Sequence, residues 1–79
     1  MTKLDFVGTT GTLRGIAVVQ LHDALWRITL AAGDVLGYIE RVAAPTGDRF
    51  RVKRFLPRQR RFLVDGEFWS MDDAIDCFR

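Results

Sequence analysis

The chain has 79 residues, of which 48% are hydrophobic and 11% aromatic, and its formal net charge is +2. This composition argues against wholesale disorder and fits one small globular domain. Cys77 is the only cysteine, which excludes an intrachain disulfide, and no apolar run approaches the roughly 18 residues of a membrane span. We therefore expect a cytoplasmic protein that does not act at a membrane.

The charges are sorted along the chain into three blocks. Residues 1–40 carry three cations and four anions, and residues 65–79 carry one cation and five anions. The middle block, residues 41–64, carries eight cations and a single anion, Asp48. A basic block of this kind attracts an anionic partner, and the acidic end of the chain could pair with it instead.

The N-terminal part of the chain gives the weakest structural signal. Residues 1–12 lack a clear hydrophobic period, and we expect a flexible arm ahead of a single domain over residues 13–79. Between Leu13 and Leu21 an apolar run fits either a first strand or a short helix. Its β-branched residues favour the strand.

A hairpin is expected next. The segment Trp26–Leu30 alternates apolar and polar residues, which is typical of a strand with one buried face. A turn at Gly33-Asp34 precedes the β-branched and aromatic run Val35–Val42, which is the expected returning strand. Gly37 interrupts this run and predicts a bulge or a close backbone approach. In the strand over residues 26–30, the side chains expected to point inward are those of Trp26, Ile28 and Leu30.

A third, basic strand follows a turn at residues 45–48. Residues 49–53 alternate, with cations on one face and Phe50 and Val52 on the other. The alternation fails at Arg54-Phe55, which predicts a bulge or the end of the strand, and we end it near Leu56. Residues 57–64 are then expected to form a basic loop.

The C-terminal end predicts an amphipathic helix. Ser70 precedes it and Asp73 follows three residues later, which approximates a capping box. The expected fold is α+β, an antiparallel meander of three to four strands with this helix packed on one face. The apolar positions of the helix are Met71, Ala74, Ile75 and Phe78.

The hairpin with Trp26, Gly33 and Gly37-Tyr38, followed by a third strand and a helix, resembles a known architecture. It is similar to the three-stranded-sheet-plus-helix DNA-binding domains of AP2 proteins and of some integrase amino termini. The resemblance covers roughly residues 25–78 and rests on element order without a specific fingerprint. It implies a sheet that lies on DNA. The chain departs from those domains at residues 57–64, where a basic segment precedes the helix.

The basic block has a spacing that suits nucleic acid. Alternate residues on one strand face lie about 6.5 to 7 Å apart, twice the phosphate rise of roughly 3.4 Å along one nucleic-acid strand. We expect binding to DNA or RNA, with DNA favoured, because arginine forks bind phosphate and can read guanine. The expected contact residues are Arg41, Arg49, Arg51, Lys53, Arg54, Arg58, Arg60 and Arg61.

Two alternatives stay open. The basic strand could be an exposed edge of a protein-interaction or self-associating adaptor, binding an acidic partner or the acidic C-terminal helix of a second copy. It could also be a solvated edge without a partner. Either function suits a phage-encoded or host regulatory protein. Phe62, Phe68 and Trp69 could stack on bases, but next to a helix start we expect them in the core.

No pattern in the chain predicts an enzyme. The only histidine, His22, lies beside Asp23 in an expected turn, and an adjacent aspartate does not orient an imidazole as a catalytic triad does. Asp72 and Asp76 share a helix face but lack further metal ligands. We therefore expect no catalytic residue, no metal or cofactor, and no small-molecule substrate.

Overall fold

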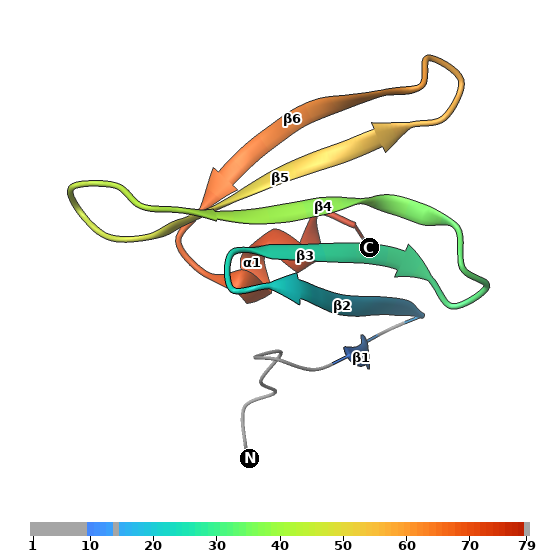
Figure 1. Cartoon of the computed structure of the whole chain (residues 1–79), viewed down its shortest axis with the longest axis horizontal. Helices are drawn as coiled ribbons and strands as arrows, with labels where there is room; N and C mark the ends of the chain where they lie inside the picture. Colours follow the sequence, from blue (N-terminus) through green and yellow to red (C-terminus); the bar gives the residue numbers. More distant parts are fainter. Residues whose placement is uncertain (1–9, 14, 79) are drawn as a thin grey trace.

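The computed structural model describes residues 10–13 and 15–78, with the backbone alone for residues 10–13. Within these residues the strands pair antiparallel and only with their neighbours in sequence, so the sheet is an open six-stranded meander (Figure 1). A single helix packs on one face of this sheet, in contact with β5 and β6. The elements are β1 (Thr10–Leu13), β2 (Ile16–His22), β3 (Leu25–Leu30), β4 (Val35–Val42), β5 (Arg49–Leu56), β6 (Arg61–Phe68) and α1 (Met71–Asp76).

The α+β fold with an antiparallel meander and one C-terminal helix on one face is confirmed. The described sheet has six strands where three or four were expected. One additional strand is β1, which includes residues 10–12 of the expected N-terminal arm and pairs with β2. Residues 1–9 of that arm lie outside the described residues. The other additional strand is β6, which occupies half of the segment expected to be a basic loop.

The core lies between the sheet and α1. Period-2 alternation turns one residue in two of β2 to β5 towards the helix, and the helix returns its apolar face. Leu30 was expected to point inward, but it is 40% exposed because it is the last residue of β3, where the chain turns. The buried residues are Ile16, Val18, Trp26, Ile28, Ile39, Val52, Ala74, Ile75 and Phe78.

The helix begins as the sequence predicts. The Ser70 hydroxyl oxygen accepts a hydrogen bond from the backbone N–H of Asp73 at 3.1 Å, so Ser70 is the N-cap. Asp72 and Asp73 lie in the first turn, where their charges complement the helix dipole. This six-residue helix, the only one in the described part of the chain, is too short to cross a membrane.

Gly37 of β4 lies between β3 and β5 and faces Phe78, which follows α1. A bulge or a close backbone approach was expected at Gly37, and both are found. The β3–β4 register shifts beside it, between Ile28 and Thr29. A Cβ atom at Gly37 would overlap the carbonyl oxygen of Lys53 and would lie 2.8 Å from Cε1 of Phe78. A side chain is therefore excluded at this point by backbone on one side and by the core on the other.

The β5–β6 hairpin is the main difference from the expected fold. Strand β5 ends at Leu56, as predicted, and the chain turns over residues 57–60, where the N–H of Arg60 donates to the carbonyl oxygen of Pro57 at 3.2 Å. Strand β4 pairs with β5 only as far as Arg54, and beyond that residue the turn end of the hairpin diverges from β4 (Figure 1). We call residues 57–61 at this end the hairpin tip.

The expected break of β5 at Arg54-Phe55 is wrong, because β5 continues regularly through both residues. The irregularity lies in β6, where Val52 opposes Gly66 and the next residue, Lys53, opposes Val64, so Asp65 is the extra residue of a bulge. Arg54 points to the helix side, where the other β5 residues are apolar, and Phe55 points to the opposite face, where the other β5 residues are cations. The alternation of residue types therefore breaks at this point, although the strand itself continues.

Candidate nucleic-acid interface

The face of the sheet opposite α1, here called the open face, carries the basic row. Arg49, Arg51 and Lys53 alternate along β5 with Phe50 and Val52, and those two pack on the helix side. The three cations therefore share the open face, as the period-2 spacing predicts.

The basic row is matched by acidic residues of neighbouring strands. The guanidinium Nε of Arg51 lies 2.9 Å from the Glu67 carboxylate of β6, and an Nη of Arg49 lies 3.9 Å from the same carboxylate. The ammonium of Lys53 lies 3.0 Å from the Glu40 carboxylate of β4. Because these side chains are about one-third exposed, each pair contributes less than about 1 kcal/mol. A phosphate at the row would have to compete with two carboxylates.

The basic strand is not an exposed edge, and the expectation that it is one is wrong. Strand β5 pairs with β6 on one side and, from Arg49 to Arg54, with β4 on the other, so the backbone groups of the basic row are already used in the sheet. The acidic end of the chain was expected to pair with the basic block, within one chain or across two copies. Two of its residues, Glu67 and Asp65, pair with β5 arginines of their own chain.

Two of the expected contact residues lie on the helix side of the sheet, away from the row. Arg41 is 3.9 Å from the Asp48 carboxylate, and its guanidinium lies 6.0 Å from the ring centroid of Trp26. Arg54 donates to the carbonyl oxygen of Cys77 at 2.6 Å and to the Asp65 carboxylate at 2.9 Å. The geometry gives Arg54 a structural task, because a cation near a helix C-terminus satisfies free carbonyl groups there.

The hairpin tip holds the remaining expected cations, Arg58, Arg60 and Arg61. All three are exposed, and none of them forms an ion pair with another residue in the described ranges. Arg58 and Arg60 lie in the turn after β5, and Arg61 is the first residue of β6, where the hairpin has diverged from β4. These are the cations of the basic block that an outside anion can reach without displacing a carboxylate.

An aromatic cluster lies on the open face next to the tip, formed by Tyr38 of β4, Phe55 of β5 and Phe62 of β6. The ring centroid of Phe62 is 5.4 Å from that of Tyr38, in an edge-to-face arrangement, and 5.1 Å from that of Phe55. Phe62 is 46% exposed. Phe62 was expected in the core, and that expectation is wrong. The missed signal was the equal distance of Phe55 and Phe62 from the turn at residues 57–60, which pairs them across a hairpin.

The other two aromatic residues of that group have different positions. Phe68 packs against the core, as expected. The same expectation is wrong for Trp69, which is 61% exposed. The guanidinium of Arg49 lies 4.0 Å from its ring centroid, which is a cation–π contact. Arg49 is therefore engaged by both Glu67 and Trp69, at the end of the hairpin opposite the tip.

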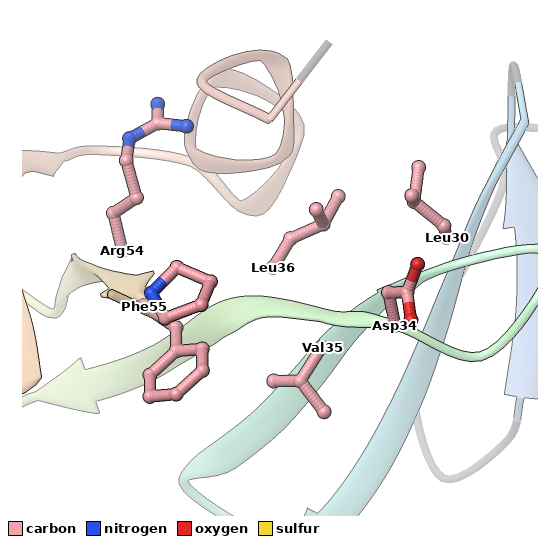
Figure 2. A pocket seen from close by; sticks show the side chains of 7 residues that line it. Leu30, Asp34, Val35, Leu36, Arg54 and Phe55 are labelled. Carbon is pink, nitrogen blue, oxygen red and sulfur yellow. The ribbon is translucent and has the colours of Figure 1, made fainter. Parts of the chain in front are cut away.

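A hollow of about 440 Å³ lies between the first residues of β4 and the last residues of β5, where the two strands no longer pair (Figure 2). In this view Arg54 and Asp34 lie at opposite ends of it, and the surfaces between them are mainly apolar. Since Arg54 is bound to the helix C-terminus, the hollow has no free cation for a ligand. The lining residues are Leu30, Asp34, Val35, Leu36, Arg54, Phe55 and Pro57.

His22 and Cys77 are the only histidine and the only cysteine of the chain. His22 accepts the backbone N–H of Ala24 at its Nδ1 at 3.1 Å and so closes a turn. Burial raises the pKa of the Cys77 thiol, the Asp65 carboxylate raises it further, and Arg54 lowers it. A raised pKa leaves less thiolate at neutral pH and hence a poorer nucleophile. No group of three or more metal-ligating side chains occurs among the described residues.

The strongest candidate site is thus the tip cations together with the aromatic cluster on the open face. Its residues come from β4, β5, β6 and the turn between β5 and β6. The sequence matches no family model, and no curated protein or solved structure is significantly similar to it.

Proposed function

We propose that the protein is a small non-enzymatic nucleic-acid-binding module that takes single-stranded segments, with DNA favoured over RNA, on its open face. One observation carries the proposal: three cations without ion pairs at the hairpin tip lie next to an exposed cluster of aromatic rings. Proteins that bind single strands combine a positively charged path for the backbone with rings on which bases stack. A cytoplasmic location, expected from the single cysteine, stays part of the proposal.

The tip cations are the main phosphate contacts in this proposal. The basic row adds little, because Glu40 and Glu67 neutralise two of its three charges. About four phosphates would be neutralised in total, which gives a slope of log K against log salt of roughly −3 for a single strand.

The aromatic cluster supplies the contact with bases. Phe62 is the outermost ring, held from two sides by Tyr38 and Phe55. A ring fixed by its neighbours loses little conformational entropy when a base stacks on it. Removing such a ring costs roughly 1 to 3 kcal/mol of binding per stacked base.

The test is fluorescence anisotropy of labelled single-stranded DNA, single-stranded RNA and duplex DNA over a range of salt concentrations. We expect the single strands to bind more tightly than the duplex, with the slope given above. Arg58→Ala should flatten the slope by about 0.7 of a unit. Arg41→Ala is the matched control, since Arg41 is an exposed arginine on the other side of the sheet and should leave the slope unchanged.

Phe62→Ala tests the contact with bases in the same assay. We expect it to weaken binding to single strands by roughly 5- to 150-fold without changing the salt slope. Leu21→Ala, which also removes a large exposed apolar side chain, should have no effect. Binding that ignores salt, or an equal loss from Arg58→Ala and Arg41→Ala, would overturn the proposal.

A further inference from the structure

Strand β6 is an edge of the sheet. It pairs with β5 on one side, and no strand of the described chain pairs with its other side. The five residues 61–65 are all exposed, and three of them are large and apolar in succession: Phe62, Leu63 and Val64, with Leu63 44% and Val64 57% exposed. An exposed edge strand with apolar side chains is a template for pairing with another strand, and natural proteins usually protect such an edge.

The sequence of this edge is complementary to itself. If two copies of β6 pair antiparallel with a two-fold axis through Leu63, each Leu63 faces its equivalent. Phe62 then faces Val64 of the other copy, and Arg61 faces Asp65 of the other copy. Aromatic with β-branched pairs and pairs of opposite charge are the favourable cross-strand neighbours, each contributing roughly 0.2 to 1 kcal/mol.

The side chains also lie on matching faces, as an antiparallel ladder requires. The β5–β6 register sets Phe62 and Val64 opposite Phe55 and Lys53, on the open face. The same register sets Leu63 and Arg61 opposite Arg54 and Leu56, on the helix side. Asp65 also lies on the helix side, where it binds Arg54. Every pair in the Leu63-centred register therefore joins side chains of one face.

The two charged groups that face each other in this register, Arg61 and Asp65, are free to form an ion pair between copies. Arg61 forms no ion pair with another described residue, and both hydrogen bonds from Arg54 to Asp65 end on Oδ2. The Oδ1 atom of Asp65 can therefore accept from Arg61 of a second copy. Neighbouring registers lack this match. An axis through Phe62 puts Arg61 opposite Leu63, and an axis through Val64 puts Phe62 opposite Gly66, which has no side chain.

We propose that the protein forms a two-fold homodimer in which the β6 strands pair antiparallel about Leu63 and join two six-stranded sheets into one. Because both copies use the same edge, the assembly closes as a dimer and does not extend into a filament through β6. Five paired residues on each strand make a small interface, so the dimer is weak, with a dissociation constant of about micromolar or higher.

This dimer does not require nucleic acid, but it pairs Arg61, one of the tip cations, and leaves Arg58 and Arg60 for phosphate. It also has a consequence for the shape of the surface. An axis perpendicular to the sheet keeps the open faces of the two copies on one side. The two aromatic clusters would then lie on either side of the joint on one continuous face.

The first test is sedimentation velocity over a range of protein concentrations, without nucleic acid. We expect the mass to rise with concentration from the 9.0 kDa of one chain to twice that value. Leu63→Lys places two ammonium groups at the axis and should weaken the dimer at least about tenfold. Leu21→Lys, at an equally exposed position on β2, should leave it intact. A 9.0 kDa species at every concentration, or a dimer indifferent to Leu63→Lys, would overturn the proposal.

The second test exchanges the charges of the Arg61–Asp65 pair between copies, so its outcome does not depend on whether the Leu63→Lys variant folds. Arg61→Asp places two carboxylates opposite each other in its own dimer, and Asp65→Lys does the same with two cations. Each variant alone should be monomeric. In an equimolar mixture Asp at 61 of one chain faces Lys at 65 of the other, while Arg61 faces Asp65, so a heterodimer should form. Failure of the mixture to associate would exclude the Leu63-centred register.

Discussion

At the residue scale, Arg60 stands out by its backbone. With a φ of +54° it is the only non-glycine residue with positive φ among the described residues. The left-handed region costs an ordinary residue roughly 1 to 2 kcal/mol, because its Cβ crowds the following carbonyl oxygen. Arg60 closes the turn of the β5–β6 hairpin, where glycine is the usual residue. The chain thus keeps a cation at the hairpin tip at the expense of local strain.

Arg60→Gly is expected to have opposite effects on stability and on binding. Relief of the left-handed strain should raise the free energy of unfolding by about 1 kcal/mol, measured by urea denaturation. Loss of one tip cation should weaken oligonucleotide binding and flatten its salt slope. Arg58→Gly is the matched control, because Arg58 does not have positive φ and its replacement should lower stability. A less stable Arg60→Gly protein would contradict the assignment of strain.

At the scale of elements, α1 is held at both ends by side chains from outside the helix. Six residues are far fewer than the roughly 12 to 15 that an isolated helix needs, so α1 depends on its contacts. Ser70 satisfies an N-terminal N–H, and Arg54 of β5 binds the Cys77 carbonyl just past the C-terminus. Between these ends Ala74 and Ile75 are fully buried against the sheet.

Ser70→Ala is expected to lower the free energy of unfolding by about 1 kcal/mol, because the N–H of Asp73 loses its acceptor. Ser70→Asp keeps an acceptor and adds a favourable charge near the helix dipole, so it should stay close to the original stability. Chemical denaturation monitored by tryptophan fluorescence measures both. Equal stability of the alanine variant and the original protein would show that the cap contributes nothing.

Local patterns predicted most of the elements and only part of the site. Strand β4 and the Ser70 cap follow from β-branched composition and from spacing within a few residues. Strand β6 was missed because Phe62, Leu63 and Val64 are consecutive apolar residues on both faces of an edge, without period-2 alternation. The position of Arg54 depends on a carbonyl group 23 residues away, and no local pattern reports such a contact.

At the scale of the whole molecule, Gly37 lets the sheet and the helix approach each other. The backbone of β4 runs so close to β5 at this point that the Lys53 carbonyl fills the space of a side chain, and the ring of Phe78 closes the other side. Phe78 follows the helix and is buried, so this contact joins the C-terminal end of the chain to the middle of the sheet.

Gly37→Ala is expected to destabilise the protein by about 1 to 3 kcal/mol, since the added methyl group must displace backbone. That is a large share of the roughly 4 to 12 kcal/mol expected for a domain of this length. Thermal denaturation measures the loss. Trimming the ring with Phe78→Leu should not rescue the double variant, because the overlap with the Lys53 carbonyl remains. Full rescue would show that the ring alone excludes the side chain.

The neighbour-to-neighbour order of the strands has a consequence for the rate of folding. Each pairing closes only a short loop, so little chain entropy is lost before the next pairing forms. We expect the chain to fold faster than β-sandwiches of similar size, whose strands pair across long separations. The helix is the exception, since Cys77 and Phe78 just after it contact Arg54 of β5 and Gly37 of β4, which come together only once these strands are paired. Helix docking should therefore be a late event, with low φ-values for substitutions in α1.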